Sequence, residues 1–594
     1  MPENILIAIA WPYANAEIHV GNITGSHLPG DIVARYHRLK GDHVLMVSGT
    51  DSHGTPVTIA ADKEGIPVED VYKKYHKGFI DLFMKLGIQY DLYTSTHTEN
   101  HFRVSQSMFL ALQKNGFLFT RRTMQWYSPG AKRFLPDRYV EGTCYICGFT
   151  GARSDQCDHC GNVLEPEKLI NPKSKVDGST PELRETEHYF LELSKLEPDV
   201  TDFLRKRSGY LRETVLGESL GKIEAEGLKP RPITRDLDWG IPVPVEGWDD
   251  KRLYVWFEAV IGYLSAAIEW AKLSNAQEDW KAWWVNPAAK AFYFIGKDNI
   301  FFHTALWPAE LMGAGRQFLQ IFSEEEGNLN LPFDVPANQF MNLEGQKISG
   351  SRNWAIWGRD ALTRYDPDAL RYYLTINMPE NHDSDWDWKE FVAKNNGELV
   401  ATWGNLANRV LSFSYKHWDG FIPNIDRAAL RPADINLLTS IEAGFQTVGE
   451  YLDTVKLRAA LQEVFRLAAT VNQYLDQMAP WQAIKTDKNS AALTIYTALK
   501  AIDSLKVMFS SFLPFTCERL NGFFGYENPL FGESYTETVK DNLGEHLVLK
   551  YHGLASSQWK PSQLKPGGKL NAPAPLFKKL EESVIEEERA RLGK

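Results

Sequence analysis

The first hundred residues alternate between short apolar runs and longer stretches in which apolar positions recur with helical spacing. Residues 4–10 form a strand-like run rich in Ile, Ala and Leu, and residues 43–47 form a second run that ends near Asp51. The stretch from Gly21 to Leu39 between them has a helical pattern. A strand, a helix and a strand in this order predict a βαβ unit and therefore a parallel sheet. Further helices are expected over residues 68–86 and 101–115.

The pattern changes at three places further along the chain. After Gly116, short strand-like pieces alternate with glycine turns, which indicates an inserted domain. Helix-and-strand character returns near Leu253, and residues 291–295 form another strand-like run. From about Phe391 the chain is mostly helical, with few strand signals before residue 530, as in a helix bundle.

These changes predict an α/β fold with several domains. A Rossmann-type parallel-sheet domain is split by the insertion and is followed by an α-helical bundle. A proline-rich segment, either a linker or a strap over the surface, and a solvated, charged tail helix over residues 578–594 come last. The expected boundaries are 1–116 and 253–338 for the sheet domain, 117–252 for the insertion, 339–390 for a connecting region, 391–550 for the bundle and 551–594 for the linker and tail.

Composition narrows the classes of function. The 594 residues carry a net charge of -11, so a nucleic-acid partner would have to bind local positive patches. No apolar run approaches the roughly 20 residues that span a bilayer, and no targeting segment is recognisable. The five cysteines fit a reducing compartment rather than a disulfide framework. We therefore expect a cytoplasmic protein without a membrane partner.

Four of the five cysteines have the spacing C-x2-C-x9-C-x2-C within the insertion. Two such pairs fit one tetrahedral ion with four thiolate ligands, and four protein ligands leave no open position for chemistry. The pattern predicts one structural Zn²⁺, with an iron–sulfur cluster as the alternative. The acidic cluster at 383–385 lacks ligand spacing, so we expect a solvated turn there. The predicted metal ligands are Cys144, Cys147, Cys157 and Cys160.

The segment His19-Val20-Gly21-Asn22 falls where the first strand-like run passes into a helix. In open α/β sheets, ligands bind beyond the carboxyl ends of the strands, and a helix N-terminus attracts phosphate. Gly21 allows close approach of a backbone or a base, and His19 and Asn22 can donate hydrogen bonds to phosphate oxygens. Read alone, such a segment is common by chance, and a capped helix explains it better.

Four segments in one order resemble the methionyl-tRNA synthetases, a group of class I aminoacyl-tRNA synthetases. They are Pro12 to Asn15, His19 to Asn22, Gly49 to Pro56, and Phe294 to Asp298. The resemblance extends to about residue 550. It implies an enzyme that forms methionyl-adenylate from methionine and ATP with Mg²⁺, and then charges initiator and elongator tRNA(Met). His19 to Asn22 corresponds to the HIGH motif of the family, with Asn22 where a second His is usual.

A second family motif, KMSKS, matches the segment Lys347-Ile348-Ser349-Gly350-Ser351. Such a loop closes on ATP, and its lysines neutralise the triphosphate as pyrophosphate leaves. Gly350 replaces the second lysine, and we expect the adjacent Arg352, or Lys347 itself, to supply the missing charge. The resemblance implies catalytic roles for His19, Asn22 and Lys347, and ATP binding by His19, Gly21, Asn22, Lys347, Ser349, Gly350 and Ser351.

One helix face carries apolar residues at i, i+3, i+4 and i+7 from Trp256 to Tyr263, and this stripe alone would indicate core packing. The resemblance implies instead that the face lines a methionine pocket, where aromatic rings contact the thioether sulfur. Asp51 matches the family residue that holds the substrate ammonium. Trp11 and Val260 differ from the residues that are commonest there. The implied methionine-binding residues are Trp11, Tyr13, Asp51, Trp256, Ala259, Val260, Tyr263, Phe302 and His303.

The resemblance also places anticodon recognition in the helical region. Asn405 and Arg409 are spaced i, i+4, and Trp481 follows Ala479-Pro480; base stacking on Trp and base-edge hydrogen bonds suit these residue types. Alone, they would indicate a buried Trp and a solvated pair. We expect a monomer, since no appended oligonucleotide-binding module follows. The alternatives are another class I synthetase, a degenerate synthetase fold that only binds RNA, and a zinc-containing nucleotidyltransferase.

Overall fold

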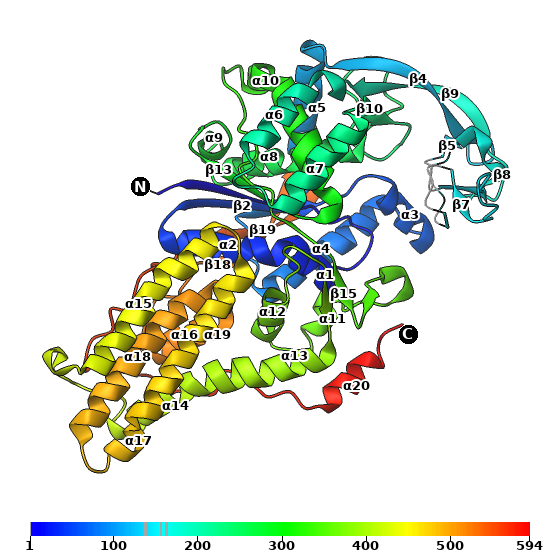
Figure 1. Cartoon of the computed structure of the whole chain (residues 1–594). Coiled ribbons are helices and arrows are strands. Elements are labelled where there is room, and N and C mark those ends of the chain that lie inside the picture. The colour runs from blue at the N-terminus through cyan, green and yellow to red at the C-terminus, as the bar shows by residue number, and fades with distance from the viewer. Residues whose placement is uncertain are drawn as a thin grey trace.

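A seven-stranded sheet lies at the centre of the computed structural model, which describes residues 2–135, 139–154, 157, 159–160, 164 and 166–593 (Figure 1). The strand order is β14-β13-β1-β2-β3-β19-β18, and the first five strands are parallel. The predicted parallel sheet is therefore confirmed. The strands are β1 (Asn4–Ile9), β2 (His43–Thr50), β3 (Leu92–Ser95), β13 (Lys290–Gly296), β14 (Ala337–Asn338), β18 (Glu533–Asp541) and β19 (Gly544–His552).

Alternate residues of β1 face two different helical layers. Ile5, Ile7 and Ile9 share a core with α2 (Leu28–Lys40) that continues into the helical bundle. Leu6 and Ala8 share a second core with helices on the opposite face. Because both faces are covered, the positions from Ile5 to Ile9 are all apolar, which explains the continuous run in the sequence. The helices on the second face are α5 (Glu99–Lys114), α8 (Val255–Leu273), α9 (Lys281–Trp284) and α10 (Trp307–Ser323).

The first crossover after β1 begins with α1 (Val20–Asn22) and passes through a π-helical turn, Ile23–His27, into α2. The helical pattern from Gly21 to Leu39 therefore corresponds to helical structure in the fold. The helix α4 (Val68–Leu86) has the predicted bounds, and α5 agrees within two residues. Between β2 and α4 lies α3 (Thr55–Glu64).

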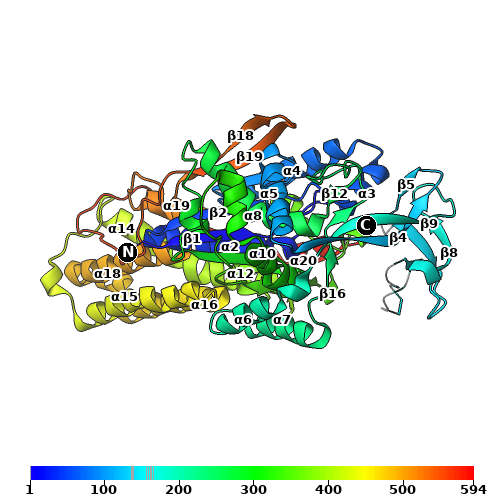
Figure 2. The ribbon, with the colours of Figure 1, turned by 90° about the horizontal axis from the view of Figure 1, so that it is seen from above.

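A long two-stranded ribbon carries the insertion away from the sheet. Strand β4 (Leu118–Ser128) pairs antiparallel with β9 (Glu182–Leu191), and Figure 2 shows the ribbon arching out to a small lobe. The lobe holds β5 (Arg133–Phe134), β6 (Val140–Thr143), β7 (Ala152–Arg153) and β8 (Ile170–Ser174). The chain returns to the sheet through α6 (Glu197–Lys206), α7 (Glu213–Glu226), β10 (Arg231–Pro232), β11 (Thr234–Arg235) and β12 (Arg252–Leu253).

A small sheet connects the second half of the parallel-sheet domain with the bundle. Strand β15 (Met341–Leu343) pairs with β16 (Gln346–Lys347) and, in parallel, with β17 (Ser384–Trp386). The prediction of a solvated turn at 383–385 is therefore wrong. Three residues, two of them polar, carry too little pattern to predict a strand. Two helices, α11 (Gly358–Ala361) and α12 (Pro367–Ile376), lie between β16 and β17.

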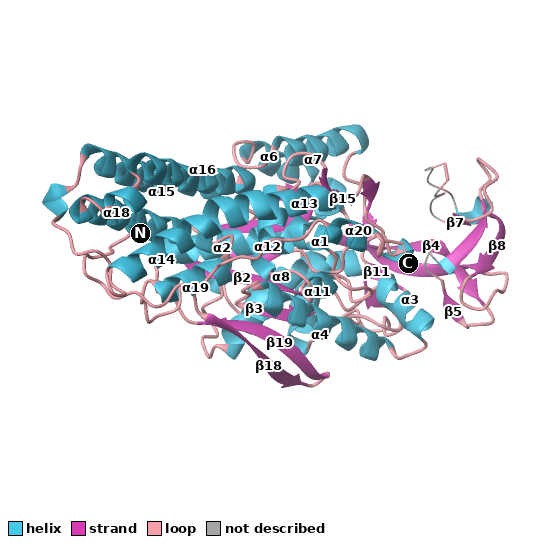
Figure 3. Ribbon diagram, turned by 90° about the horizontal axis from the view of Figure 1, so that it is seen from below, coloured by secondary structure: helices cyan, strands magenta, loops and turns pink. Residues whose placement is uncertain are grey.

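Long helices form a separate layer at one end of the molecule (Figure 3). They pack through one continuous apolar core that includes Leu461, Val464 and Leu505. No helix in the described part of the chain combines the length and apolar character needed to cross a lipid bilayer. The bundle contains α13 (Trp388–Lys394), α14 (Asn405–His417), α15 (Pro432–Asp453), α16 (Leu457–Met478), α17 (Pro480–Ala483), α18 (Lys488–Ser510) and α19 (Pro514–Phe523).

The chain after the bundle returns to the seven-stranded sheet. All of β18 and most of β19 fall in the range 391–550 that the sequence pattern gives to the bundle, yet β19 pairs antiparallel with β3. The proline-rich segment then runs back along the bundle, where Leu564 and Leu570 are buried, so it is a strap. The tail helix α20 (Ser583–Arg589) is shorter than predicted. It is not fully solvated, because Glu588 is buried and accepts a hydrogen bond from Arg364.

Candidate active site

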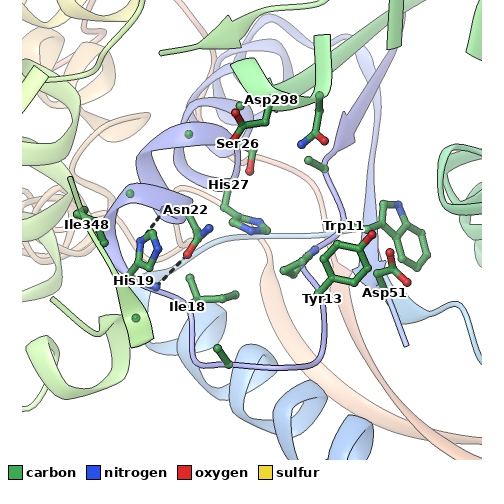
Figure 4. A pocket seen from close by; sticks show the side chains of 18 of the residues that line it. Trp11, Tyr13, Ile18, His19, Asn22, Ser26, His27, Asp51, Asp298 and Ile348 are labelled. Carbon is green, nitrogen blue, oxygen red and sulfur yellow. Dashed lines mark hydrogen bonds between the residues drawn. The ribbon is translucent and has the colours of Figure 1, made fainter. Parts of the chain in front are cut away.

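The carboxyl ends of β1, β2 and β13 meet at one edge of the sheet, where a cavity of about 500 Å³ opens (Figure 4). We call it the reaction cavity. Two segments far apart in the sequence, at His19 and at Lys347, both line it, and the two predicted phosphate-binding segments therefore lie together. Residues that follow the strands also line it: Trp11, Tyr13, Asp51 and Asp298.

His19 caps the first turn of α1. Its Nδ1 accepts a hydrogen bond from the backbone N–H of Asn22 at 3.3 Å, and the Asn22 Oδ1 accepts one from the backbone N–H of His19 at 3.2 Å. Burial lowers the pKa of His19 to about 4, so the ring is neutral at pH 7. Because Nδ1 accepts, the proton of the neutral ring resides on Nε2, which is left to donate to a ligand. Asn22, in place of the usual His, completes this cap.

Gly21 allows the second segment to approach the first. A Cβ atom at Gly21 would lie 3.0 Å from the His19 ring and 3.2 Å from Cδ1 of Ile348. The backbone N–H of Val20 donates to the carbonyl oxygen of Ile356 at 3.0 Å, which ties the loop to the helix start. Any larger residue at position 21 would therefore push the loop away from His19.

Two lysines flank one aromatic ring at the mouth of the reaction cavity. The Nζ of Lys347 lies 4.9 Å, and that of Lys297 3.9 Å, from the centre of the Phe340 ring. Asp383 accepts hydrogen bonds from Lys297 at 2.8 Å and from the backbone N–H of Phe340 at 2.9 Å. Sequence analysis did not assign Lys297 to the site. The Gly296-Lys297-Asp298 run directly after a strand was the signal available.

The rest of the loop lies beside the reaction cavity. Gly350 lines it, whereas Ser349, Ser351 and Arg352 do not. A Cβ atom at Gly350 would lie 3.1 Å from the Trp357 ring, which explains a glycine at this position. Arg352 is exposed in a 3₁₀ turn, Gly350–Arg352.

The predicted amino-acid-binding residues line the same cavity with one exception. Phe302 lies behind Trp256, with the two rings stacked 4.0 Å apart, and does not line the reaction cavity. The Tyr263 hydroxyl lies 2.7 Å from Nε2 of His303, whose Nδ1 donates to the carbonyl oxygen of Asn299 at 2.9 Å. Burial lowers the pKa of His303 to about 4, so its neutral ring accepts from Tyr263. The residues that line the cavity are Trp11, Tyr13, Asp51, Trp256, Ala259, Val260, Tyr263 and His303.

Asp51 is a buried carboxylate that faces this cavity and makes no ion pair with a Lys or Arg among the described residues. Burial and the negative charge of Glu258 raise its pKa well above the ordinary value. Burial by itself would also raise the pKa of Glu258. The hydrogen bonds and charges of His53 at 2.7 Å and His101 at 2.6 Å outweigh burial and bring this pKa to about 2. The site therefore holds buried negative charge that favours a cationic ligand.

The sequence matches a family described as tRNA synthetases class I (M) over residues 5–411. A second family, described as the anticodon binding domain of methionyl tRNA ligase, matches residues 425–547. The chain belongs to the class I tRNA synthetases of the methionyl group.

Curated relatives agree with this assignment, and a solved structure shares the fold. The methionine–tRNA ligase of Thermomicrobium roseum is 49% identical, over 100% of this chain and 99% of the relative. That of Roseiflexus castenholzii is also 49% identical, over the same shares. The crystal structure of Mycobacterium tuberculosis methionyl-tRNA synthetase bound by methionyl-adenylate has a TM-score of 0.73 at 22% identity, covering 97% of this chain and 100% of that one.

Two glycines make room for the Trp11 ring in this synthetase. A Cβ atom at Gly262 would lie 2.8 Å from the ring, and one at Gly49 only 2.1 Å from it. Gly49 lies on β2 and Gly262 on α8, so the space is built from two elements. The indole Nε1 of Trp11 is buried and has no hydrogen-bond partner among the described residues. The large side chain at position 11 is therefore accommodated by small neighbours.

The four insertion cysteines of the synthetase converge on one point. Their sulfur atoms all lie within 4.8 Å of one another, with 4.0 Å from Cys144 to Cys160 and 3.6 Å from Cys147 to Cys157. These separations are too long for a disulfide. They fit the edge of roughly 3.8 Å that four thiolates have around an ion with metal–sulfur bonds of about 2.3 Å. The predicted metal-binding geometry is thus present.

The three predicted anticodon residues lie together and away from the reaction cavity. The guanidinium of Arg409 on α14 lies 4.7 Å from the centre of the Trp481 ring on α17. Asn405 is exposed one turn before Arg409 on the same helix. Figure 1 shows α17 at the end of the bundle remote from the central sheet. These side chains form a surface of the kind that unpaired bases can reach.

Proposed function

We propose that this synthetase activates methionine with ATP and transfers the methionyl group to the 3′ end of tRNA(Met), initiator and elongator. The observation that supports this most strongly is the single cavity shared by His19, Lys347, Asp51 and the aromatic pocket. One oxygen of the methionine carboxylate attacks the α-phosphorus, and pyrophosphate leaves with the electrons of the broken bond. A terminal ribose hydroxyl then attacks the carbonyl carbon, and AMP leaves as the hydroxyl proton passes to its phosphate.

The chemistry needs positioning and charge stabilisation rather than a protein nucleophile. The Nε2–H of His19 and the Asn22 amide donate to phosphate oxygens, with Gly21 allowing close approach. Lys347 neutralises the departing pyrophosphate, and the loop residues Ser349, Gly350 and Ser351 reach ATP when the loop closes. Mg²⁺ accompanies the triphosphate.

The amino-acid substrate binds with its ammonium on Asp51 and its thioether among aromatic rings. Sulfur contacts with ring edges contribute about 0.3–1.5 kcal/mol each. Trp256 closes this pocket, and Phe302 supports Trp256 from behind by stacking. The Tyr263–His303 pair offers a fixed polar wall.

The bundle reads the anticodon, with bases stacking on Trp481 and hydrogen-bonding Asn405 and Arg409. We place the protein in the cytoplasm as a monomer. We keep the domain boundaries expected from the sequence as part of this proposal, with the hairpin of β18 and β19 as a return to the catalytic sheet.

Methionine-dependent ATP–pyrophosphate exchange, followed by charging of tRNA(Met), tests this function. Wild-type protein should exchange label with methionine and not with other amino acids. Trp481→Ala should leave exchange unchanged and abolish charging, while Trp481→Phe, which keeps a stacking ring, should retain most of it. An absence of exchange would contradict the proposal and favour a synthetase fold that only binds RNA.

We also propose that the four cysteines hold one structural Zn²⁺. Elemental analysis should find one zinc per chain, and Cys157→Ser should lose it. Because the cluster lies in the insertion, exchange should persist in this variant while charging falls. Iron in place of zinc would point to the cluster alternative.

A further inference from the structure

A buried series of hydrogen bonds connects the hairpin of β18 and β19 with the end of β2, next to the reaction cavity. The Nε2–H of His76 on α4 donates to the carbonyl oxygen of Leu547 on β19 at 2.6 Å. The Nδ1 of the same ring lies 2.7 Å from the hydroxyl of Thr50, the last residue of β2. The hydroxyl of Tyr93 on β3 lies 2.8 Å from that of Thr50. His76 therefore joins a strand near the start of the chain to one near its end.

The direction of each bond follows from the protonation of the His76 ring. Burial lowers its pKa to about 4, so the ring is neutral at pH 7 and carries one ring proton. Because a carbonyl oxygen can only accept, that proton is on Nε2, and Nδ1 accepts from the Thr50 hydroxyl. The Thr50 oxygen in turn accepts from the Tyr93 hydroxyl. All three side chains are buried, so this arrangement fixes them against one another.

A second buried pair fastens the same hairpin to α8. The Nε2 of His546 on β19 lies 2.8 Å from one carboxylate oxygen of Glu269, and the other oxygen accepts from the Thr94 hydroxyl at 2.9 Å. Glu269 lies on the helix that carries Trp256 and Tyr263 to the reaction cavity. The hairpin therefore supports two elements of the amino-acid pocket, the end of β2 and α8.

Thr50 directly precedes Asp51, the carboxylate that we assign to the substrate ammonium. Successive side chains of a strand point to opposite faces of the sheet. Asp51 faces the reaction cavity (Figure 4), and the Thr50 hydroxyl is held from behind by His76. A binding group has to be held within about 0.5 Å of its productive position. The support behind Thr50 therefore bears on the affinity for the ammonium group.

We propose that the hairpin of β18 and β19 is part of the methionine site, and that His76 is a positioning residue that holds Asp51 in place through Thr50. This inference rests on the proposed function and deepens it for the amino-acid substrate. His76 does not line the reaction cavity and contacts neither substrate. It fixes the strand end from which the carboxylate reaches the ammonium group, and the carbonyl oxygen of Leu547 fixes His76.

Binding of methioninol and of its deaminated analogue, which differ only in the ammonium group, tests the positioning role. Displacement of labelled methionine from the full-length protein in equilibrium dialysis gives both affinities. His76→Phe keeps a ring in the core but can neither donate to Leu547 nor accept from Thr50. Its Kd for methioninol should rise about tenfold, while its Kd for the deaminated alcohol should stay close to that of wild type. His76→Gln, whose amide offers one donor and one acceptor, should restore most of the methioninol affinity.

Two further variants separate positioning from a general loss of packing. Thr50→Val removes the hydroxyl between His76 and Asp51 and should weaken methioninol binding as His76→Phe does. The double variant should lose no more than either single variant, because both changes break the same connection. His37→Phe is the matched control, since His37 is a buried histidine of α2 whose partner, Asp42, lies before the amino end of β2. It should lower the Tm without changing either affinity.

His546→Phe tests the hairpin itself, because it removes the bond to Glu269. It should also weaken methioninol and spare the deaminated alcohol, and unchanged methioninol binding would remove the hairpin from the site. Unchanged methioninol binding in His76→Phe, or an equal loss for both alcohols, would overturn the positioning role. A wild-type protein that binds neither methionine nor methioninol would contradict the proposed function as well, whereas wild-type binding with unaffected variants would contradict this inference alone.

Discussion

Burial and the charge of Glu258 both raise the pKa of Asp51, the carboxylate that we assign to the substrate ammonium. A raised pKa means that protonation begins at a higher pH than for an ordinary aspartate. Affinity for the ammonium is therefore present at high pH and is lost on acidification. The KM for methionine should rise as the pH falls through this pKa. Asp51→Asn should raise KM at neutral pH by at least about thirtyfold, since losing one partner of a buried charge pair costs about 2 kcal/mol or more, and it should abolish the pH dependence.

Exchange rates measured between pH 5 and 8 decide this prediction. Glu258→Gln serves as the comparison, because it removes the neighbouring charge. In this variant the rise of KM on acidification should begin at a lower pH. If KM still rose on acidification in Asp51→Asn, the titration would belong to another group.

Trp11 and Gly262 should behave as a coupled pair. In Gly262→Ala the new methyl group would lie 2.8 Å from the indole, so the ring has to move. Overpacking of this kind costs about 1–3 kcal/mol of stability, against a gain of roughly 0.8–1 kcal/mol from helix propensity. The KM for methionine should also rise in Gly262→Ala. Combining Trp11→Leu with Gly262→Ala should restore both the stability and the KM.

Thermal unfolding and methionine KM measure the effect. Gly217→Ala is the matched control, because a Cβ atom at this helical glycine meets nothing within 4 Å. It should be neutral or stabilising. Additive effects of Trp11→Leu and Gly262→Ala would show that the two positions do not interact.

At the scale of elements, the segment from β16 to α11 carries two cations: Lys347 at the end of β16 lines the reaction cavity, and Arg352 in the following loop does not. Lys347→Ala should slow adenylate formation by 10² to 10³, the loss typical of one preorganised donor of about 2.7–4 kcal/mol. We expect loop closure to bring Arg352 to the charge that a second lysine would neutralise, and on this hypothesis Arg352→Ala should slow adenylate formation on the order of a hundredfold. Arg352→Lys should keep most of the rate.

Rapid-quench measurement of adenylate formation separates these variants from effects on tRNA. An unchanged rate for Arg352→Ala would exclude Arg352 from this role and leave Lys347 alone with it.

Elements with strong periodicity could be predicted from the sequence, and elements that depend on distant partners could not. The bounds of α4 follow from its apolar spacing. Strand β18, from Glu533 to Asp541, is mostly exposed and polar, and its hairpin joins β3, more than four hundred residues earlier. A local pattern holds no signal for such pairing.

The residues of the candidate site also divide into those that the sequence predicts and those that only the fold brings together. His19 and Lys347 could be found because each lies in a short motif with its own chemistry. The space for Trp11 could not, because Gly49 and Gly262 belong to different elements that meet only in the fold. Phe302 was expected in the pocket wall, and its stacking behind Trp256 depends on the turn after β13, which periodicity does not describe.

At the scale of the whole molecule, one buried arginine ties the catalytic domain to the bundle. Arg371 on α12 is fully buried and forms an ion pair with Asp31 on α2 at 2.7 Å. It also donates to the carbonyl oxygens of Phe512 at 2.9 Å and Ser511 at 3.0 Å, which follow the bundle helix α18. The same side chain therefore contacts the layer under the sheet and the anticodon-binding helices.

Arg371→Met should weaken the contact between the catalytic domain and the bundle. It should leave both substrate sites untouched. Asp31 would keep Arg35 and the backbone N–H of Gln89 as its partners. The carbonyl oxygens of Phe512, Ser511 and Leu86 would each lose a donor, so unfolding should become easier by about 3–5 kcal/mol. The orientation of the bundle relative to the reaction cavity depends on this contact. At a temperature where the variant is folded, exchange should persist while charging of tRNA falls. Arg466→Met, which removes an exposed arginine of the bundle paired with Glu463, should change stability by less than about 1 kcal/mol and leave charging intact. If exchange and charging declined together in Arg371→Met, the arginine would serve the fold of the catalytic domain and not its connection to the bundle.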